Sequence, residues 1–260
     1  VRVADGSDLA VGEIGPGESV GELAILLEGP RTATVRAVRD SSLVRLSRDS
    51  MNEILERDPQ TIMGLVKDIV RRARETQSGA PKIKPVSTVT LVPAGSRGPL
   101  DQVSTHLMTA LEHHGRVVRV TDKERQALGD VPDHEVIRWL HSLEAEHDFV
   151  VFCADGEATP WTRLCLRQAD RILLVADSEQ DAEPNPLERE LLAQDSAAYV
   201  AQQDLVLVHA AQGGIRHTAR WLSGRHVGAH HHLRSGHEAD YARLARVLTG
   251  KAVALVLSGG

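Results

Sequence analysis

The sequence predicts a mixed fold, in which a β-rich segment with following helices precedes an α/β domain built on a doubly wound parallel sheet. Three observations support this prediction. Short β-type runs separated by turn residues fill residues 1–47, helical periodicity follows over 50–76, and from residue 86 onward apolar strand-like runs alternate with helical ones. Such alternation is typical of a parallel sheet covered by helices.

The composition indicates a globular protein and excludes several kinds of partner. The chain has 260 residues, of which 42% are apolar and 25% charged, and its 30 basic and 36 acidic residues give a net charge of −6. This balance, with only 3% aromatic residues, argues against a nucleic-acid partner or a polybasic membrane anchor. The two cysteines fit a reducing compartment. We expect a cytoplasmic protein, or one on the cytoplasmic face of a membrane if an amino-terminal part outside this sequence carries an anchor.

The first domain is expected over residues 1–80. Its turn signals are Asp5-Gly6, Gly15-Pro16-Gly17, Gly29-Pro30 and Arg39-Asp40. They favour the short strands of a β-roll, whose amino-terminal part we expect to lie outside this sequence. Two helices are predicted over 50–76, with an interruption near Asp58-Pro59. Residues 81–85 are predicted to form a linker.

The second domain is expected over residues 86–250 as an α/β connecting domain. The predicted strands are 86–92, 116–120, 148–153, 171–176 and 204–209, and the main predicted helices are 134–146, 186–194 and 241–248. Residues 251–260 are predicted to form a further strand that runs into a glycine turn. We expect this last strand to begin another domain.

The segment 20–37 carries the residue types that a cyclic phosphate ligand requires. A short helix is predicted to begin near Gly21, and its first amides are unpaired and can face a phosphate. Arg31 can neutralise that phosphate with paired hydrogen bonds, a role that a planar guanidinium fills better than a lysine. The Glu22 carboxylate can accept a hydrogen bond from a ribose hydroxyl.

Residues 20–37 resemble the phosphate-binding cassette of cyclic-nucleotide-binding domains. The resemblance implies that Glu22 binds the ribose and Arg31 the phosphate. Further lining positions would be Gly21, Ala24, Thr32 and Ala33. Threonine after the arginine is associated with cGMP and alanine with cAMP, so either is a possible regulatory ligand, and no other cofactor is expected. The competing interpretation is a degenerate domain that keeps its shape for packing.

One pattern in the same region suggests a different chemistry. Residues 17–21 match Gly-x-Ser-x-Gly, the nucleophile elbow of serine hydrolases. An elbow needs a buried strand before the serine, a helix after it and a base within reach. Ser19 instead follows Gly15-Pro16 in the turn of the cassette, so we do not expect it to be a nucleophile.

The loop after the predicted strand 86–92 lies where a P-loop would lie. Residues 93–101 contain no Gly-Lys-Ser/Thr, so the lysine for the β- and γ-phosphates and the hydroxyl for Mg²⁺ are absent, and Asp101 would repel phosphate. This favours a degenerate P-loop-like or Rossmann-like scaffold. It weakens the alternative of a MinD-like nucleotide hydrolase.

Two further segments point to a family. Residues 154–173 and 242–260 closely resemble segments of neuropathy target esterase and its bacterial relatives. These proteins place cyclic-nucleotide-binding domains before an α/β connecting region and a patatin-like phospholipase domain, and the order here is the same. The resemblance implies a serine hydrolase that acts on lysophospholipids and related carboxylic esters through a Ser-Asp dyad.

The end of the sequence resembles the start of a patatin-like domain. Gly259 and Gly260 match the first two glycines of its oxyanion loop, whose amides stabilise developing negative charge. The nucleophile and the dyad aspartate would follow residue 260. We therefore expect no catalytic residue in this chain and expect the chain by itself to be inert.

Two clusters of ionisable residues carry no predicted site. Histidines occur at 226, 230–232 and 237, but Gly228 and Gly236 interrupt any regular ligand spacing, so we expect exposed loop histidines and no metal. Residues 71–74, Arg-Arg-Ala-Arg, are predicted to be the solvated end of a helix, where cations favour the dipole.

The leading hypothesis is the regulatory and connecting part of a patatin-like serine lysophospholipase or carboxylic-ester hydrolase, controlled by a cyclic-nucleotide-binding domain. The expected partners are a cyclic nucleotide, a downstream patatin-like catalytic domain and, through it, phospholipid or lysophospholipid. The alternative is a non-catalytic cyclic-nucleotide-binding or scaffold protein.

Overall fold

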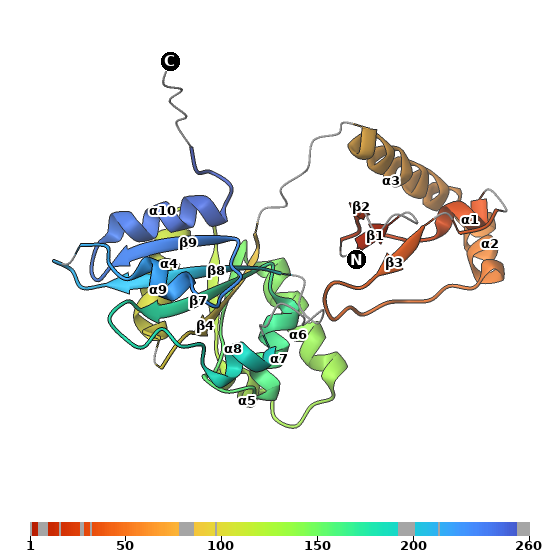
Figure 1. Cartoon of the computed structure of the whole chain (residues 1–260). Helices are drawn as coiled ribbons and strands as arrows, with labels where there is room; N and C mark the ends of the chain where they lie inside the picture. Colours follow the sequence, from red (N-terminus) through yellow and green to blue (C-terminus); the bar gives the residue numbers. More distant parts are fainter. Residues whose placement is uncertain are drawn as a thin grey trace, which may run out of the picture. The chain divides into compact units, whose positions relative to one another are not determined.

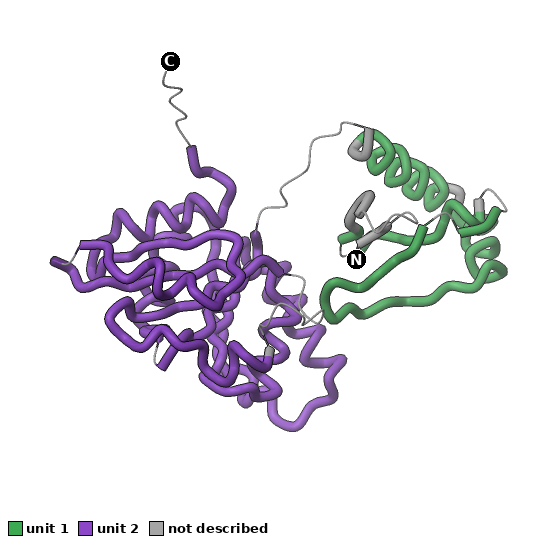
Figure 2. The backbone as a smooth tube through the Cα atoms, viewed as in Figure 1, with its two compact units in different colours: residues 1–82 green, residues 83–260 purple. Residues whose placement is uncertain are grey.

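The computed structural model describes residues 2–4, 10–15, 17–26, 29–31, 33–77, 86–96, 98–191, 201–212 and 214–253. Two compact units divide the chain, unit 1 over residues 1–82 and unit 2 over residues 83–260 (Figure 2). Among the described residues, no helix is both long and apolar enough to span a membrane.

Unit 1 combines a small antiparallel sheet with three helices (Figure 1). The elements are β1 (Arg2–Ala4), β2 (Ala10–Glu13), α1 (Glu22–Leu26), β3 (Thr34–Arg36), α2 (Arg48–Arg57) and α3 (Pro59–Gln77). The strand order is β2-β1-β3, with Val3 opposite Gly12 on one side and Val35 on the other. The short strands predicted before residue 47 are present.

The predicted break between two helices occurs at Asp58 and Pro59. Asp58 Oδ1 accepts a hydrogen bond from the Gln60 amide at 3.1 Å, and its Oδ2 accepts one from the Thr61 hydroxyl at 2.7 Å. Proline is tolerated as the first residue of α3, because an amide at that position would have no partner within the helix. The sequence prediction of two helices interrupted here is confirmed.

The described side chains of unit 1 bury little apolar surface. Its exposed large apolar residues are Val20, Leu23, Val35, Leu43, Val44, Leu46, Ile54, Met63, Val66 and Val70. Among the side chains described in this unit, only that of Glu22 is buried, at 6% exposure. Burial of a carboxylate is costly unless it is paired and hydrogen-bonded, so this is the position in unit 1 that requires partners.

Unit 2 is built on a six-stranded parallel sheet in the order β5-β6-β4-β7-β8-β9. The strands are β4 (Thr88–Pro93), β5 (Val117–Val120), β6 (Phe149–Cys153), β7 (Arg171–Asp177), β8 (Gln202–His209) and β9 (Ala229–Arg234). The central strands are apolar and buried, as expected where helices cover a parallel sheet on both faces.

Helices cover both faces of this sheet (Figure 1). They are α4 (Leu100–Glu112), α5 (Asp122–Ala127), α6 (Asp133–Glu146), α7 (Pro160–Gln168), α8 (Pro186–Leu191), α9 (Thr218–Leu222) and α10 (Glu238–Leu248). Successive residues of a strand point to opposite faces, so Leu91 packs in the core beneath α4 and α10, and Val92 packs in the core beneath α7, α8 and α9. The predicted doubly wound α/β domain is confirmed.

Four expectations about secondary structure need correction or lie partly or wholly outside the described residues. Strand β9 was not predicted, and the structure places it within the region expected to be a loop. Residues 251–253 form no strand, and the rest of the predicted strand 251–260 lies outside the described residues. The predicted helix 186–194 is present as α8 up to Leu191; its residues 192–194 and the predicted linker 81–85 lie outside the described residues.

Candidate functional site

The predicted cassette, residues 20–37, has the expected local geometry around Gly21; below, the name cassette segment is used for residues 15–33, which include the turn before it and Arg31. Gly21 has a φ of 87°, a left-handed conformation that favours glycine, and α1 starts at the next residue. The expectation of a short helix beginning near Gly21 is confirmed. Ala24 lies in this helix, and its carbonyl oxygen accepts a hydrogen bond from Arg48 Nη2 at 3.3 Å.

The predicted phosphate ligand lies beside the predicted phosphate-facing turn. Nη1 of Arg31 donates to the Gly21 carbonyl oxygen at 2.6 Å, and the arginine side chain is exposed. A Cβ atom at position 21 would collide with this guanidinium. Glycine at position 21 is therefore needed both for its backbone conformation and for the close approach of Arg31.

Glu22, the predicted ribose ligand, is held by a residue of α3. Its Oε1 lies 2.6 Å from Arg72 Nη2, and Arg72 Nη1 donates to the Ser19 carbonyl oxygen at 2.9 Å. The second oxygen, Oε2, is buried without a hydrogen-bond partner among the described residues. A buried acceptor without a donor is costly, so Oε2 is a candidate acceptor for a ligand hydroxyl.

The role of Arg72 differs from the sequence prediction. Residues 71–74 were expected to be a solvated helix end, but the Arg72 side chain is only 22% exposed and is bound to the cassette segment. Sequence reasoning missed this contact because Arg72 and Glu22 are 50 positions apart. The sequence carries no signal for this contact, because Asp68 stands at i−4 and is the partner that the helix itself offers to Arg72.

The remaining predicted site residues are only partly placed. Ala33 is described and half-buried, immediately before β3. Thr32, Gly259 and Gly260 lie outside the described residues.

The described residues around Ser19 form no arrangement for nucleophilic catalysis. It lies in an irregular segment, and its buried Oγ has no hydrogen-bond partner among the described residues, so no base holds it there. A nucleophile elbow requires a strand directly before the serine and a base in contact with it. The described geometry therefore agrees with the expectation that Ser19 is part of a turn.

The loop after β4 has the position of a P-loop, but side chains of unit 2 already bind it. The Gly95 amide donates to Glu188 Oε1 at 2.9 Å, and the Ala94 amide donates to the Val175 carbonyl oxygen at 2.8 Å. In a P-loop, amides such as these cradle a phosphate. Here a carboxylate accepts the Gly95 hydrogen bond, and its negative charge opposes an anion at this place.

Glu188 is fixed in turn by Arg225. Their bidentate contact has distances of 2.6 and 3.0 Å, and the side chains are only 4% and 3% exposed. Arg225 also donates to the Ala182 carbonyl oxygen at 2.6 Å and lies 4.8 Å from the centre of the Trp221 ring. This fully bonded pair ties the Gly95 end of the loop after β4 to α8 and to the segment after α9.

A hollow of about 240 Å³ lies beside the same loop. It is lined by Gly98, Pro99, Leu100, Asp101, Gln102, Asp177 and Gln180. In doubly wound folds, this carboxyl edge of the sheet is the usual place for a ligand. The carboxylates of Asp101 and Asp177 make it unfavourable for phosphate.

The histidines differ from the expectation of exposed loop residues. His226 and His237 are exposed and lie in loops, but His230, His231 and His232 belong to β9, and the last two are half-buried. His209 Nε2 and His232 Nδ1 are 2.9 Å apart. Burial, with the nearby charges of His209 and His230, lowers the pKa of His232 to about 4. No metal-binding group of three or more His, Cys, Asp or Glu side chains occurs among the described residues.

Comparison with known proteins gives matches along the whole chain. The model of the Neuropathy Target Esterase family P-loop like domain matches residues 85–239, and that of the cyclic nucleotide-binding domain matches residues 1–58. The chain is 32% identical to patatin-like phospholipase domain-containing protein 7 of Mus musculus, covering 100% of this chain and 23% of that protein.

Two further relatives match the chain at similar identity and over similar lengths. Patatin-like phospholipase domain-containing protein 6 of Homo sapiens is 30% identical, with 100% of this chain and 22% of that protein covered. Neuropathy target esterase sws of Drosophila persimilis is 32% identical, with 96% of this chain and 20% of that protein covered. The chain thus spans about a fifth of the length of these curated relatives.

Proposed function

Because the chain belongs to the neuropathy target esterase family, we propose that it is the regulatory and connecting part of a patatin-like serine hydrolase. In this proposal, a cyclic nucleotide binds the cassette segment and controls a patatin-like domain that hydrolyses lysophospholipids or related carboxylic esters. The chain described above contributes regulation and is inert by itself. The proposed location is the cytoplasm or the cytoplasmic face of a membrane.

The observation that carries the proposal is the state of Glu22. A buried carboxylate with one oxygen paired and the other without a donor is suited to a hydroxyl of a ligand. Arg31 is the matching group for a phosphate, because it is exposed and bound only to the Gly21 carbonyl oxygen among the described residues. A cyclic phosphate would replace that carbonyl as the partner of the guanidinium, with a stronger charge-assisted pair.

Unit 2 supports the connecting role. Its loop after β4 is bound by Glu188, and carboxylates line the adjacent hollow, so the site of a P-loop nucleotide is occupied by the domain's own groups. An α/β scaffold that follows a sensor and precedes a catalytic domain in the chain can transmit a change of position without chemistry of its own.

We expect Arg31→Ala to weaken binding of cAMP or cGMP by about 10- to 100-fold, because a hydrogen bond to a charged group contributes about 1.5–3 kcal/mol. Isothermal titration calorimetry of the chain with each nucleotide measures this change and identifies the preferred base. The matched control is Arg45→Ala, which removes the same charge from an exposed position outside the cassette segment. It should leave affinity within about twofold at moderate salt.

Absence of binding by the unsubstituted chain would contradict the nucleotide sensor and favour the scaffold alternative. Equal binding by the Arg31→Ala chain would place the ligand elsewhere. Either result is readable from one titration series, since the control separates loss of a specific contact from loss of net charge.

Control of hydrolysis is tested in the longer protein that carries the patatin-like domain. We expect a saturating cyclic nucleotide to change kcat for a lysophospholipid, and Arg31→Ala to abolish the change while basal hydrolysis persists. Such control requires the nucleotide to bind two states of the enzyme with different affinity. Unchanged hydrolysis at saturating cAMP and cGMP would disprove the regulatory role.

A further inference from the structure

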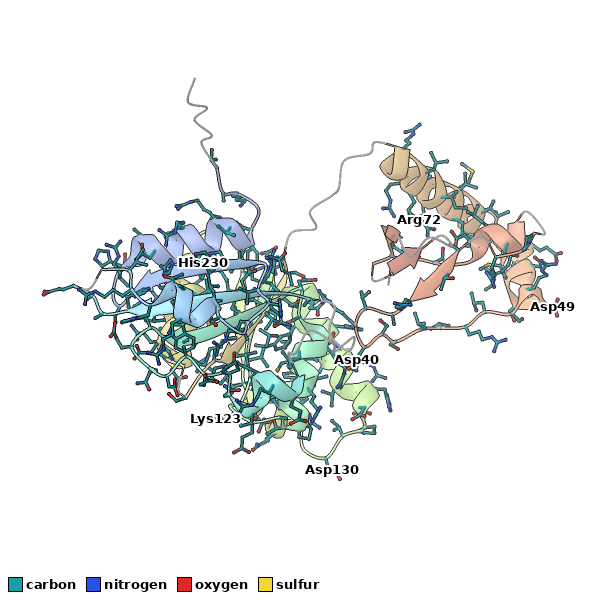
Figure 3. The ribbon with its side chains drawn as sticks, viewed as in Figure 1. Asp40, Asp49, Arg72, Lys123, Asp130 and His230 are labelled. Atoms are coloured by element: carbon teal, nitrogen blue, oxygen red, sulfur yellow. The ribbon has the colours of Figure 1, made fainter. Side chains whose placement is uncertain are left out.

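The buried carboxylate of Glu188 in unit 2 accepts more hydrogen bonds than an ion pair requires. Its Oε1 accepts from the Gly95 amide at 2.9 Å and from the Asn185 amide at 3.0 Å. Arg225 donates to both oxygens, from Nη2 to Oε1 at 3.0 Å and from Nε to Oε2 at 2.6 Å. The donors lie in the loop after β4, before α8 and after α9, segments whose side chains Figure 3 draws as sticks. The carboxylate is therefore surrounded by donors as a bound anion would be.

The capping of α8 explains only one of these hydrogen bonds. The Glu188 amide donates to Asn185 Oδ1 at 2.8 Å, and the Asn185 amide donates back to Glu188 Oε1, which is the reciprocal pair of a capping box. A capping glutamate needs no further partner. The bonds from Gly95 and Arg225 instead cross the fold, over 93 and 37 positions of the chain. They bring a backbone amide and a guanidinium to one point, and proteins hold phosphate with these two kinds of donor.

Other contacts hold the two donor groups in place. Arg225 Nη1 donates to the carbonyl oxygens of Ala182 and Trp221, at 2.6 and 3.1 Å. The Gly95 carbonyl oxygen accepts a hydrogen bond from Asn185 Nδ2 at 3.1 Å. Gly95 has a φ of 66°, and a Cβ atom there would lie 2.6 Å from the Trp221 ring, so its backbone is closely packed. We therefore expect both donors to keep their directions when the Glu188 carboxylate is removed.

The charge at this place requires an anion. The Arg225 side chain is only 3% exposed, and Glu188 is the only carboxylate that contacts it in the described part of the chain. Asp181, on the segment before α8, pairs with the exposed Arg220 at 3.1 Å. Loss of the Glu188 carboxylate would leave a buried positive charge without compensation, which is costly. A small oxyanion that reached Arg225 would remove this cost.

We propose that the Gly95 amide and the Arg225 guanidinium form an oxyanion-binding site of the kind that holds phosphate, and that Glu188 is the ligand which the chain itself supplies to it. The carboxylate ties the loop after β4 to α8, as a bound phosphate would, without a nucleotide. The inference is independent of the cassette segment and of any cyclic nucleotide. It predicts that the site accepts a small free oxyanion once the carboxylate is removed.

The test removes the carboxylate from the whole chain and supplies inorganic phosphate. We expect phosphate to stabilise E188A against urea in a saturable way, relative to sodium chloride at the same ionic strength. At a phosphate concentration ten times its Kd, the unfolding equilibrium constant should fall about tenfold. Phosphate also stabilises proteins because it is excluded from their surface. The same series on the unsubstituted chain, in which Glu188 fills the site, measures this general effect for subtraction.

Three further variants show whether the gain belongs to this site. E188Q keeps a neutral side chain in the place of the carboxylate, so phosphate should stabilise it no more than the unsubstituted chain. E188A/R225Q lacks the guanidinium as well and should lose the gain. E190A is the matched control for the lost charge, because Glu190 lies on the same helix and is 54% exposed. It should respond to phosphate as the unsubstituted chain does.

The fluorescence of Trp221 provides a second readout. Its buried indole lies against Gly95, and the Arg225 guanidinium is 4.8 Å from the ring centre. Without denaturant, phosphate should change the emission of E188A with the same midpoint as the gain in stability, and it should leave the emission of E188Q unchanged. If E188A is unfolded in chloride, recovery of the folded signal in phosphate becomes the readout, and E188A/R225Q should not recover.

Several outcomes would overturn the oxyanion site. A gain in E188A no larger than in the unsubstituted chain would show only the general effect of phosphate, and a gain that persists in E188A/R225Q would place the anion elsewhere. An E188A chain that stays unfolded at every phosphate concentration would show that the donors form no site without the carboxylate. A parallel series with sodium formate distinguishes the ligand class, since stabilisation by formate and not by phosphate would overturn the assignment to phosphate.

Discussion

Replacement of Glu188 by alanine should destabilise unit 2 by about 3–5 kcal/mol, because breaking a buried pair leaves an uncompensated charge. The substitution would leave the buried Arg225 guanidinium without its carboxylate and the Gly95 amide without its acceptor. Denaturant unfolding followed by tryptophan fluorescence measures this loss. All three tryptophans, Trp139, Trp161 and Trp221, lie in unit 2, so the signal reports on that unit.

Two variants provide the controls. Glu190→Ala removes a carboxylate from the same helix, but Glu190 is 54% exposed and pairs with Arg163 at the surface, so a loss of less than about 1 kcal/mol is expected. Glu188→Gln keeps an acceptor for the Gly95 amide and removes the charge, and its stability should fall between the two. Equal stabilities of the Glu188→Ala and Glu190→Ala chains would show that the buried pair does not hold the loop after β4.

Most of unit 2 could be predicted from the sequence because its strands are apolar runs bounded by turns. Strand β4 is an example: from Thr88 to Val92 every residue is buried, and such a run has few alternatives in an α/β pattern. Strand β9 could not be found in this way. Its residues His230, His231 and His232 carry no strand signal, and the strand forms because β8 offers a complete parallel edge, with Leu207 opposite His232.

Of the candidate site, the sequence predicted only the residues that lie close together along the chain. Gly21, Glu22 and Arg31 have the residue types that a cyclic phosphate requires, their spacing is that of the family which the segment resembles, and the structure brings Arg31 onto Gly21. Arg72 was not predictable, because an arginine at a helix end has many possible partners and the sequence does not rank them. The same limit applies to Glu188, whose partner Arg225 is 37 positions away.

Lowering the pH from about 6.5 to about 4 should destabilise unit 2 through His232. Burial lowers the pKa of this imidazole to about 4 in the folded chain, and in the unfolded chain it returns to about 6.5. Between these values the unfolded state binds more protons than the folded state. The contribution of His232 to the free energy of unfolding is therefore fully present above about pH 6.5 and is lost as the pH falls towards 4. At about 1.4 kcal/mol per pKa unit, the loss is at most about 3 kcal/mol, and about 2 kcal/mol for a half-buried ring.

Burial is the main reason why the His232 ring resists protonation, and its contact with His209 adds to the effect. Their nitrogens are 2.9 Å apart, and a hydrogen bond between two imidazoles needs one neutral acceptor. His230 and Arg243 add positive charge nearby, and burial also lowers the pKa of His209. We therefore expect His232→Gln to flatten the stability profile between pH 5 and 6.5, measured by urea unfolding, and the exposed His237→Gln to leave it unchanged. If the His232→Gln profile were as steep as that of the unsubstituted chain, groups other than His232 would bind the protons and this prediction would be wrong. Carboxylates titrate at lower pH, so they do not mask the effect of His232 in this range.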